Sequence, residues 1–160
     1  MAVTLRLATP DDADGLRGLL PRLAEFDLPP ARDARDLWKH DLKLLEQWLV
    51  EQQADCRVHV AVDPSEQVCG LAIVTLRPEL LSLAPSAHLE ALAVASGFEG
   101  QGLGGRLLEA AEKDAREQGA ESITLHVFAV NSRARALYEK AGFEGELMRY
   151  IKPLPEGGES

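Results

Sequence analysis

The sequence predicts a single mixed α/β domain in which helices cover one central mixed sheet. Three observations support this fold class. The 160 residues suffice for one core, 46% of them are hydrophobic, and apolar runs with strand periodicity alternate with amphipathic helical segments. No repeat, linker or low-complexity block divides the chain. We therefore expect one domain over residues 1–154, followed by a flexible tail at residues 155–160.

The elements are predicted in the order βααβββαβαβ. Apolar and β-branched runs bounded by turn residues predict strands at residues 3–8, 57–62, 68–76, 87–94, 122–130 and 147–151. Apolar residues at three- and four-residue spacing predict helices at residues 10–24, 37–53, 103–119 and 132–142. Asn131 is placed to cap the last helix, and Gly119 closes the helix before it.

Charge and hydropathy exclude several classes of function. The 17 Lys+Arg and 26 Asp+Glu residues give a formal net charge of −9, which argues against nucleic acid as a partner. No apolar run approaches the roughly 18 residues of a membrane span, and the first residues lack a secretory h-region. We expect a cytoplasmic protein that does not bind membranes. Cys56 and Cys69 form no CxxC motif, so neither a disulfide nor a metal site is predicted.

A glycine-rich loop stands between a predicted strand and a predicted helix. Its glycines are Gly100, Gly102, Gly104 and Gly105. Such a loop lets backbone N–H groups converge on a phosphate or pyrophosphate, and the following helix adds its N-terminal donors. A turn that merely needs positive φ angles is the alternative. The loop lacks GxxxxGK[ST] and fits GxGxxG poorly, so neither a nucleoside triphosphatase nor a dinucleotide-binding fold is indicated.

Residues 88–143 carry a resemblance to a known family. The segments HLEALAV, FEGQGLG, TLHVFAVN and NSRARALYEKAGF together resemble the GNAT superfamily of acetyl-CoA-dependent N-acetyltransferases. The resemblance implies a mostly antiparallel sheet with one splayed parallel strand pair, flanked by about four helices. It also implies acetyl-CoA as cosubstrate, a small-molecule or peptide amine as acceptor, no metal, and homodimerisation.

The resemblance assigns a set of residues to the cosubstrate. Backbone groups freed by the splayed strand would pair with the pantetheine arm, and the glycine loop would hold the pyrophosphate. The residues implied are Leu92, Ala93, Val94, Glu99, Gly100, Gln101, Gly102, Leu103, Gly104, Gly105 and Asn131. Glu99 departs from the Gln or Arg usual at its position, and we expect its side chain to point to solvent. Capping of the helix explains Asn131 equally well.

Acetyl transfer to an amine needs an acid and a base. By resemblance, Tyr138 is the general acid for the departing thiolate, since a phenol of pKa about 10 is protonated at neutral pH. His88 and Glu90 are two residues apart on one predicted strand, so both are expected to face the same side, along with Leu92. The residues alone favour an exposed strand pair without a catalytic role. The resemblance implies a base at these positions, with Glu90 favoured, His88 next and His126 a weaker candidate.

The sequence is compatible with three classes of function. The first is an N-acetyltransferase in which an amine attacks the thioester directly within a ternary complex. A non-catalytic acyl-CoA-binding sensor or regulatory module is the alternative. The third possibility is a structural or interaction protein, in which the glycine loop and the helix motif would both have arisen by chance. The acceptor is not identified by the sequence. A group of acidic residues is hypothesised to attract a cationic amine: Glu25, Asp27, Asp33 and Asp36.

Overall fold

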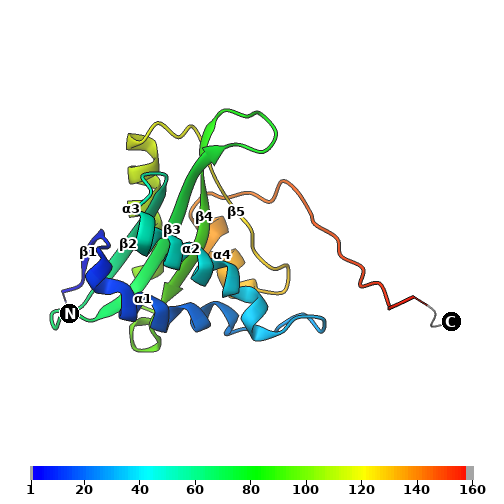
Figure 1. Ribbon diagram of the computed structural model, residues 1–160, viewed down its shortest axis with the longest axis horizontal. Helices are drawn as coiled ribbons and strands as arrows, with labels where there is room; N and C mark the ends of the chain where they lie inside the picture. The colour runs from blue at the N-terminus through cyan, green and yellow to red at the C-terminus, as the bar shows by residue number, and fades with distance from the viewer. Residues whose placement is uncertain (1, 158–160) are drawn as a thin grey trace.

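The computed structural model describes residues 2–157, which form one five-stranded sheet with helices on both faces (Figure 1). The strands lie in the order β1 (Thr4–Leu7), β2 (Cys56–Val62), β3 (Val68–Pro78), β4 (Pro85–Val94) and β5 (Ile123–Leu125). Neighbouring strands are antiparallel except for β4 and β5, which are parallel. The predicted mixed α/β fold is therefore confirmed.

Four α-helices cover the sheet, as predicted. The helical elements are η1 (Pro10–Asp12), α1 (Ala13–Leu19), η2 (Leu20–Ala24), η3 (Ala34–Leu37), α2 (Lys39–Glu51), η4 (Ser96–Phe98), α3 (Leu103–Glu117) and α4 (Ser132–Lys140). The elements α1, η2 and α2 pack on one face of the sheet, and α3 and α4 pack on the other. No helix among residues 2–157 has the length and apolar character needed to cross a bilayer.

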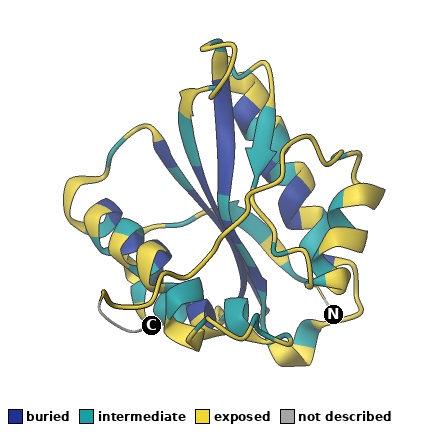
Figure 2. Ribbon diagram, turned by 90° about the vertical axis from the view of Figure 1, so that its right-hand side faces the viewer, coloured by how far each residue is buried: buried dark blue, intermediate teal, exposed yellow. Residues whose placement is uncertain are grey.

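Two hydrophobic clusters, one on each face of the sheet, hold these layers together. Leu16, Leu20 and Leu45 are fully buried against the first face, and Leu107 and Leu108 of α3 are buried against the second. Each such leucine contributes about 1.5–3 kcal/mol relative to an exposed one. The buried residues follow the central strands and the inner sides of the helices (Figure 2). The helices that carry site residues are thereby fixed to the sheet.

A β-bulge at Glu90 interrupts the pairing of β3 with β4. Val74 pairs with Leu89 and Ile73 pairs with Ala91, so Glu90 is an extra residue without a partner in the register. Leu89 packs toward α3, whereas Ala91 belongs to the cluster beneath α1 and α2. A bulge shifts the alternation of side chains and re-aims the residue within it. The expectation that Leu92 shares a face with Glu90 is therefore wrong, because Leu92 packs against the α3 side.

The parallel pair of β4 and β5 is short. Its last matched residues are Leu89 and Leu125, and beyond them the two strands separate. The strand predicted at 122–130 therefore ends early, at Leu125. The remainder of β4 keeps its bonds to β3 on one side only. This separation is the splayed pair that the resemblance implied.

The predicted last strand, at residues 147–151, is wrong. No helix or strand follows Lys140 within the described part of the chain, and the segment runs away from the body of the domain (Figure 1). Its apolar side chains are exposed: Leu147, Met148, Tyr150 and Ile151. An apolar run becomes a strand only where it pairs with a neighbouring edge, and within residues 2–157 this segment pairs with none. Of the predicted tail, residues 158–160 lie outside the described residues.

Candidate active site

A cleft of about 390 Å³ opens where β4 and β5 separate. One wall is the free side of β4, including Leu92, Ala93 and Val94, and the opposite wall is α4 with Asn131 and Tyr138. The glycine loop before α3 closes one end, and η2 with the start of α2 closes the other side. The cleft brings together segments far apart in the sequence.

The glycine loop has the conformation that its sequence requires. Gly100 and Gly102 both have φ of +75°, which is the left-handed region where a side chain is strained. Gly102 caps α3, so the N–H groups of the first helical turn, beginning at Leu103, lack acceptors within the helix. These donors border the cleft. The loop therefore forms the predicted turn and also presents backbone donors suited to an anion.

Most of the residues assigned to the cosubstrate line this cleft, with one exception. Glu99, Gly100, Gly102, Leu103, Gly104 and Gly105 line it together with the three β4 residues and Asn131. Gln101 is exposed at the tip of the loop and is not among the lining residues. Gly104 also packs closely on α4, because a Cβ added there would lie 3.4 Å from a methyl carbon of Leu137.

Glu99 does not point into free solvent, which corrects the expectation from the sequence. Its carboxylate is ion-paired with Arg22 of η2, and its second oxygen lies 3.7 Å from Nη1 of Arg133 on α4. Arg22 also donates from Nε to the carbonyl oxygen of Val94 at 3.0 Å. Two guanidinium groups therefore offset the charge that Glu99 brings to the glycine loop.

Asn131 and Tyr138 lie at the two ends of one face of α4. Oδ1 of Asn131 accepts a hydrogen bond from the N–H of Ala134 at 3.2 Å, so the predicted helix cap is confirmed. Tyr138 is half-buried, and its ring meets that of Phe143 edge-on at 5.9 Å between centroids. Burial raises the pKa of Tyr138 to about 12. The phenol is therefore protonated at neutral pH and has a proton to donate.

The two candidate bases differ in their surroundings. His88 is buried outside the cleft, with Nδ1 lying 2.7 Å from the hydroxyl oxygen of Thr124. Burial lowers the pKa of His88 to about 4. Glu90 lines the cleft, and its Oε2 accepts a hydrogen bond from the hydroxyl of Thr75 at 2.6 Å. His126 is exposed, also lines the cleft, and stacks edge-on against His88.

Asp41, which the sequence reasoning missed, lies beside Glu90. It is 6% exposed, sits in the first turn of α2 and lines the cleft. Burial, followed by the charge of Glu90, raises the pKa of Asp41 to about 7. Its signal in the sequence is its place in the apolar stripe of α2, three residues after Trp38 and four before Leu45. An acidic residue in such a stripe requires an explanation.

Of the four acidic residues hypothesised to attract an amine, only Glu25 lines the cleft, where it is ion-paired with Arg22. Asp33 caps η3 by accepting from the N–H of Arg35, and Asp36 pairs with Lys39. Asp27 is exposed outside the cleft. Local capping and surface pairing therefore account for two of the four residues.

The chain matches the Acetyltransferase (GNAT) family over residues 21–143. Two curated relatives carry acetyltransferase names. The uncharacterised N-acetyltransferase YdgE of Bacillus subtilis (strain 168) is 44% identical over 57 residues, which are 36% of this chain and 36% of that protein. The mycothiol acetyltransferase of Jonesia denitrificans is 36% identical over 109 residues, which are 67% of this chain and 33% of that protein. The chain thus matches about a third of the length of each relative.

Solved structures share the fold over nearly the whole chain. A transcriptional regulator from Bacillus halodurans C-125 superposes with a TM-score of 0.73 at 24% identity, over 96% of this chain and 100% of that chain. AAC(6')-Iy in complex with a CoA bisubstrate analogue gives a TM-score of 0.73 at 19% identity, with the same coverage. At these identities the likeness concerns the fold alone.

The match covers most of the chain, and the protein belongs to the GNAT acetyltransferase family. The resemblance drawn from the loop and from the α4 motif is therefore confirmed.

Proposed function

We propose that this protein is an N-acetyltransferase that transfers the acetyl group of acetyl-CoA to a primary amine within a ternary complex. The proposal depends on one observation. The free edge of β4, the backbone N–H donors at the start of α3 and the phenol of Tyr138 all line the same cleft. These three features supply a pantetheine partner, an anion site and a proton donor. The family membership supports the reaction class.

The end of the cleft at the start of α3 has donors that suit the phosphates of the cosubstrate. The backbone N–H groups at the start of α3 would hold the pyrophosphate, and the left-handed Gly102 leaves them uncovered by a side chain. Arg133, which is 75% exposed in its side chain, stands at the same end of the cleft and can meet a phosphate. The free edge of β4 from Ala91 to Val94 would pair with the amide groups of the pantetheine arm.

Transfer of the acetyl group to an ammonium substrate needs three proton transfers. The acceptor's ammonium first gives one proton to Glu90, directly or through water, which frees the nitrogen lone pair. As the C–N bond forms and the C–S bond breaks, the electron pair leaves with sulfur, and Tyr138 donates its proton to that sulfur. The nitrogen then loses its remaining extra proton, which restores the phenol of Tyr138. The products are the amide, free CoA and one proton, which Glu90 releases to water.

Glu90 suits the role of base better than His88. Glu90 lines the cleft, whereas His88 is buried outside it with a lowered pKa. Thr75 binds one oxygen of Glu90 and leaves Oε1 for the acceptor. His126, which also borders the cleft, could relay the proton outward.

The decisive experiment incubates the protein with acetyl-CoA and a panel of amines comprising diamines, amino sugars, arylalkylamines, amino acids and peptides. Release of the CoA thiol is followed, and the acetylated product is identified by mass. We expect release that depends on the amine. Stabilisation of the fold by CoA without turnover of any amine would instead support the non-catalytic acyl-CoA-binding module.

A further inference from the structure

Asp41 is a buried carboxylate that opens into the cleft without a protein partner. It is 6% exposed, and among residues 2–157 no hydrogen bond or ion pair to its carboxylate is found. No fully enclosed polar side-chain atom in the same residues lacks a partner, so the Asp41 oxygens must be reachable from the cleft. An unpaired carboxylate at this depth is costly unless a proton or a cation joins it.

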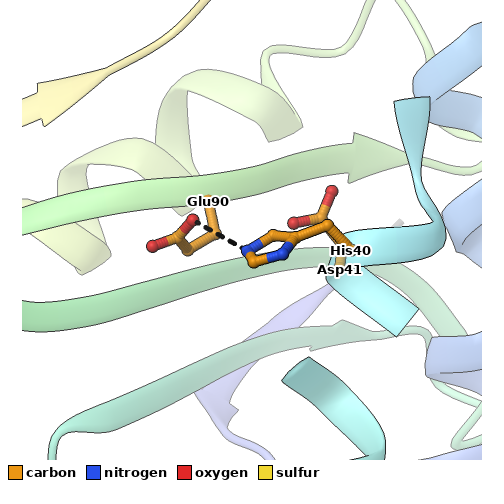
Figure 3. Close-up of side chains that lie close together, drawn as sticks. All are labelled: His40, Asp41 and Glu90. Carbon is orange, nitrogen blue, oxygen red and sulfur yellow. Dashed lines mark ion pairs between the residues drawn. The ribbon is translucent and has the colours of Figure 1, made fainter. Parts of the chain in front are cut away.

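Glu90 places a second carboxylate next to Asp41. Ligand atoms of His40, Asp41 and Glu90 lie within 4.8 Å of one another (Figure 3). Figure 3 shows Glu90 reaching from β4 toward the start of α2, where Nε2 of His40 lies 3.9 Å from Oε1 of Glu90. The other oxygen, Oε2, is bound by Thr75 and lies 3.7 Å from Nη2 of Arg77. Oε1 and the Asp41 carboxylate thus face the same space.

We propose that Asp41 and Glu90 together form the ammonium subsite for the acceptor, selecting an aliphatic amine that is cationic at neutral pH. This inference rests on the proposed function, and it makes Asp41 the residue that determines specificity. The bulge re-aims Glu90 from the sheet, and α2 supplies Asp41 from the opposite side. An ammonium group has three donors, so one cation can bridge both carboxylates.

The subsite couples amine binding to proton release. Glu90 on β4 is the charged group that acts on Asp41. The groups that act on Glu90 in turn are Arg77 on β3, His40 on α2 and the Cys56 thiol on β2. Burial raises the pKa of Cys56 to about 11, so that thiol stays neutral. The raised pKa of Asp41, about 7, keeps part of the population protonated at neutral pH. A bound ammonium favours the ionised form, so binding expels the proton and strengthens as the pH rises.

The test is calorimetric titration of butane-1,4-diamine into the protein saturated with CoA, which prevents turnover. Titrations at pH 6, 7 and 8, in two buffers of different ionisation enthalpy, give the affinity and the number of protons released. We expect binding about tenfold tighter at pH 8 than at pH 6, with proton release at pH 7. The neutral analogue butane-1,4-diol should not bind.

Matched variants identify the residue responsible. Asp41→Asn should weaken diamine binding at least tenfold and abolish both its pH dependence and the proton release, while CoA affinity is unchanged and reports an intact fold. Asp11→Asn, at an exposed position outside the cleft, should behave as the unmodified protein. Unchanged diamine affinity and proton release in Asp41→Asn would overturn the proposal. So would tight Mg²⁺ or Zn²⁺ binding that depends on Asp41 in a protein that binds no diamine.

Turnover separates this inference from the proposed function. If several amines are acetylated and Asp41→Asn leaves their kcat/KM unchanged, the acetyltransferase proposal stands and the ammonium subsite is rejected. If no amine is acetylated while diamine binding still depends on Asp41, the proposed function is rejected and the subsite stands.

Discussion

The hydroxyl of Thr75 on β3 donates a hydrogen bond to Oε2 of Glu90 on β4, with 2.6 Å between the two oxygens. This bond fixes the carboxylate that the β4 bulge turns toward the cleft. A hydrogen bond to a charged group contributes about 1.5–3 kcal/mol. Thr75 is therefore a positioning residue for Glu90, the proposed base.

Thr75→Val should lower kcat/KM by about tenfold or more, because the loss of roughly 1.5 kcal/mol of positioning corresponds to a factor of about ten. Steady-state kinetics with the fastest acceptor measures the effect. Thr75→Ser keeps the hydroxyl and should restore activity, and CoA affinity should be equal in all three proteins. Equal activity of the valine and serine variants would remove Thr75 from this role.

Tyr138→Phe should lower kcat by about 10²- to 10⁴-fold, the range typical of a general acid, because only the transferable proton is lost. CoA affinity should stay within about twofold, since the ring and its packing on Phe143 remain. Pre-steady-state thiol release measures the chemical step. Tyr150→Phe is the control, because Tyr150 is 85% exposed on the extended C-terminal segment. Normal turnover by the Tyr138 variant would assign the acid role elsewhere.

Glu99→Gln should tighten CoA binding several-fold at low salt. The substitution removes a negative charge from the glycine loop, releases Arg133 from its carboxylate partner and leaves Arg22 paired with Glu25 alone. One charge pair at about 4 Å in water is worth about 1 kcal/mol. The gain should shrink in 0.5 M salt through screening. Titration of CoA at low and high salt measures the gain in affinity and its loss on screening. The control is Glu121→Gln, because Glu121 is exposed. Weaker binding would mean that Glu99 is needed to orient the two arginines.

Asp41 should make the fold less stable as the pH rises from about 4 to 7. Because its pKa is raised to about 7, the folded protein holds this proton more tightly than the unfolded chain does within that window. The free energy of unfolding therefore falls with rising pH, by at most about 4 kcal/mol from this group. Denaturant titrations should show that Asp41→Asn is more stable than the unmodified protein at pH 8 and loses this part of the pH dependence.

The comparison that isolates this group is the difference between Asp41→Asn and Asp11→Asn at each pH, since other carboxylates titrate over the same range. A difference that does not change between pH 4 and pH 8 would contradict the assignment of the raised pKa to Asp41.

Local sequence determines the parts of the site that were predicted correctly. Asn131 caps α4 because a short polar side chain before a helix accepts from the first turn, and this signal is complete within four residues. Gly100 and Gly102 mark the left-handed positions of the loop for a similarly local reason. Apolar runs with strand periodicity likewise located β2, β3 and β4, and apolar residues at three- and four-residue spacing located the four helices.

The parts that sequence did not predict depend on contacts between distant segments. The pairing of Glu99 with Arg22 requires η2 to pack beside the glycine loop, which no local pattern encodes. The bulge at Glu90 is not marked in the run HLEALAV, because the four residues after Glu90 are all apolar and suit either face of the sheet. The largely apolar run at residues 147–151 predicts a strand, but its conformation depends on whether it pairs with the edge of a sheet. Asp41 is the exception, because an acidic residue within an apolar helical stripe is visible in the sequence and indicates a functional role.

In the proposed reaction the acetyl group passes from CoA to the amine without a protein-bound intermediate, and a stoichiometric product measurement distinguishes this route from others. The fastest acceptor from the panel is reacted with limiting acetyl-CoA, and free thiol, acetylated amine and intact protein mass are quantified in the same sample. We predict one acetylated amine for each thiol released, with no acetylated protein at any time. Thiol release without acetylated amine, or a protein-bound acetyl group that precedes product, would contradict direct transfer.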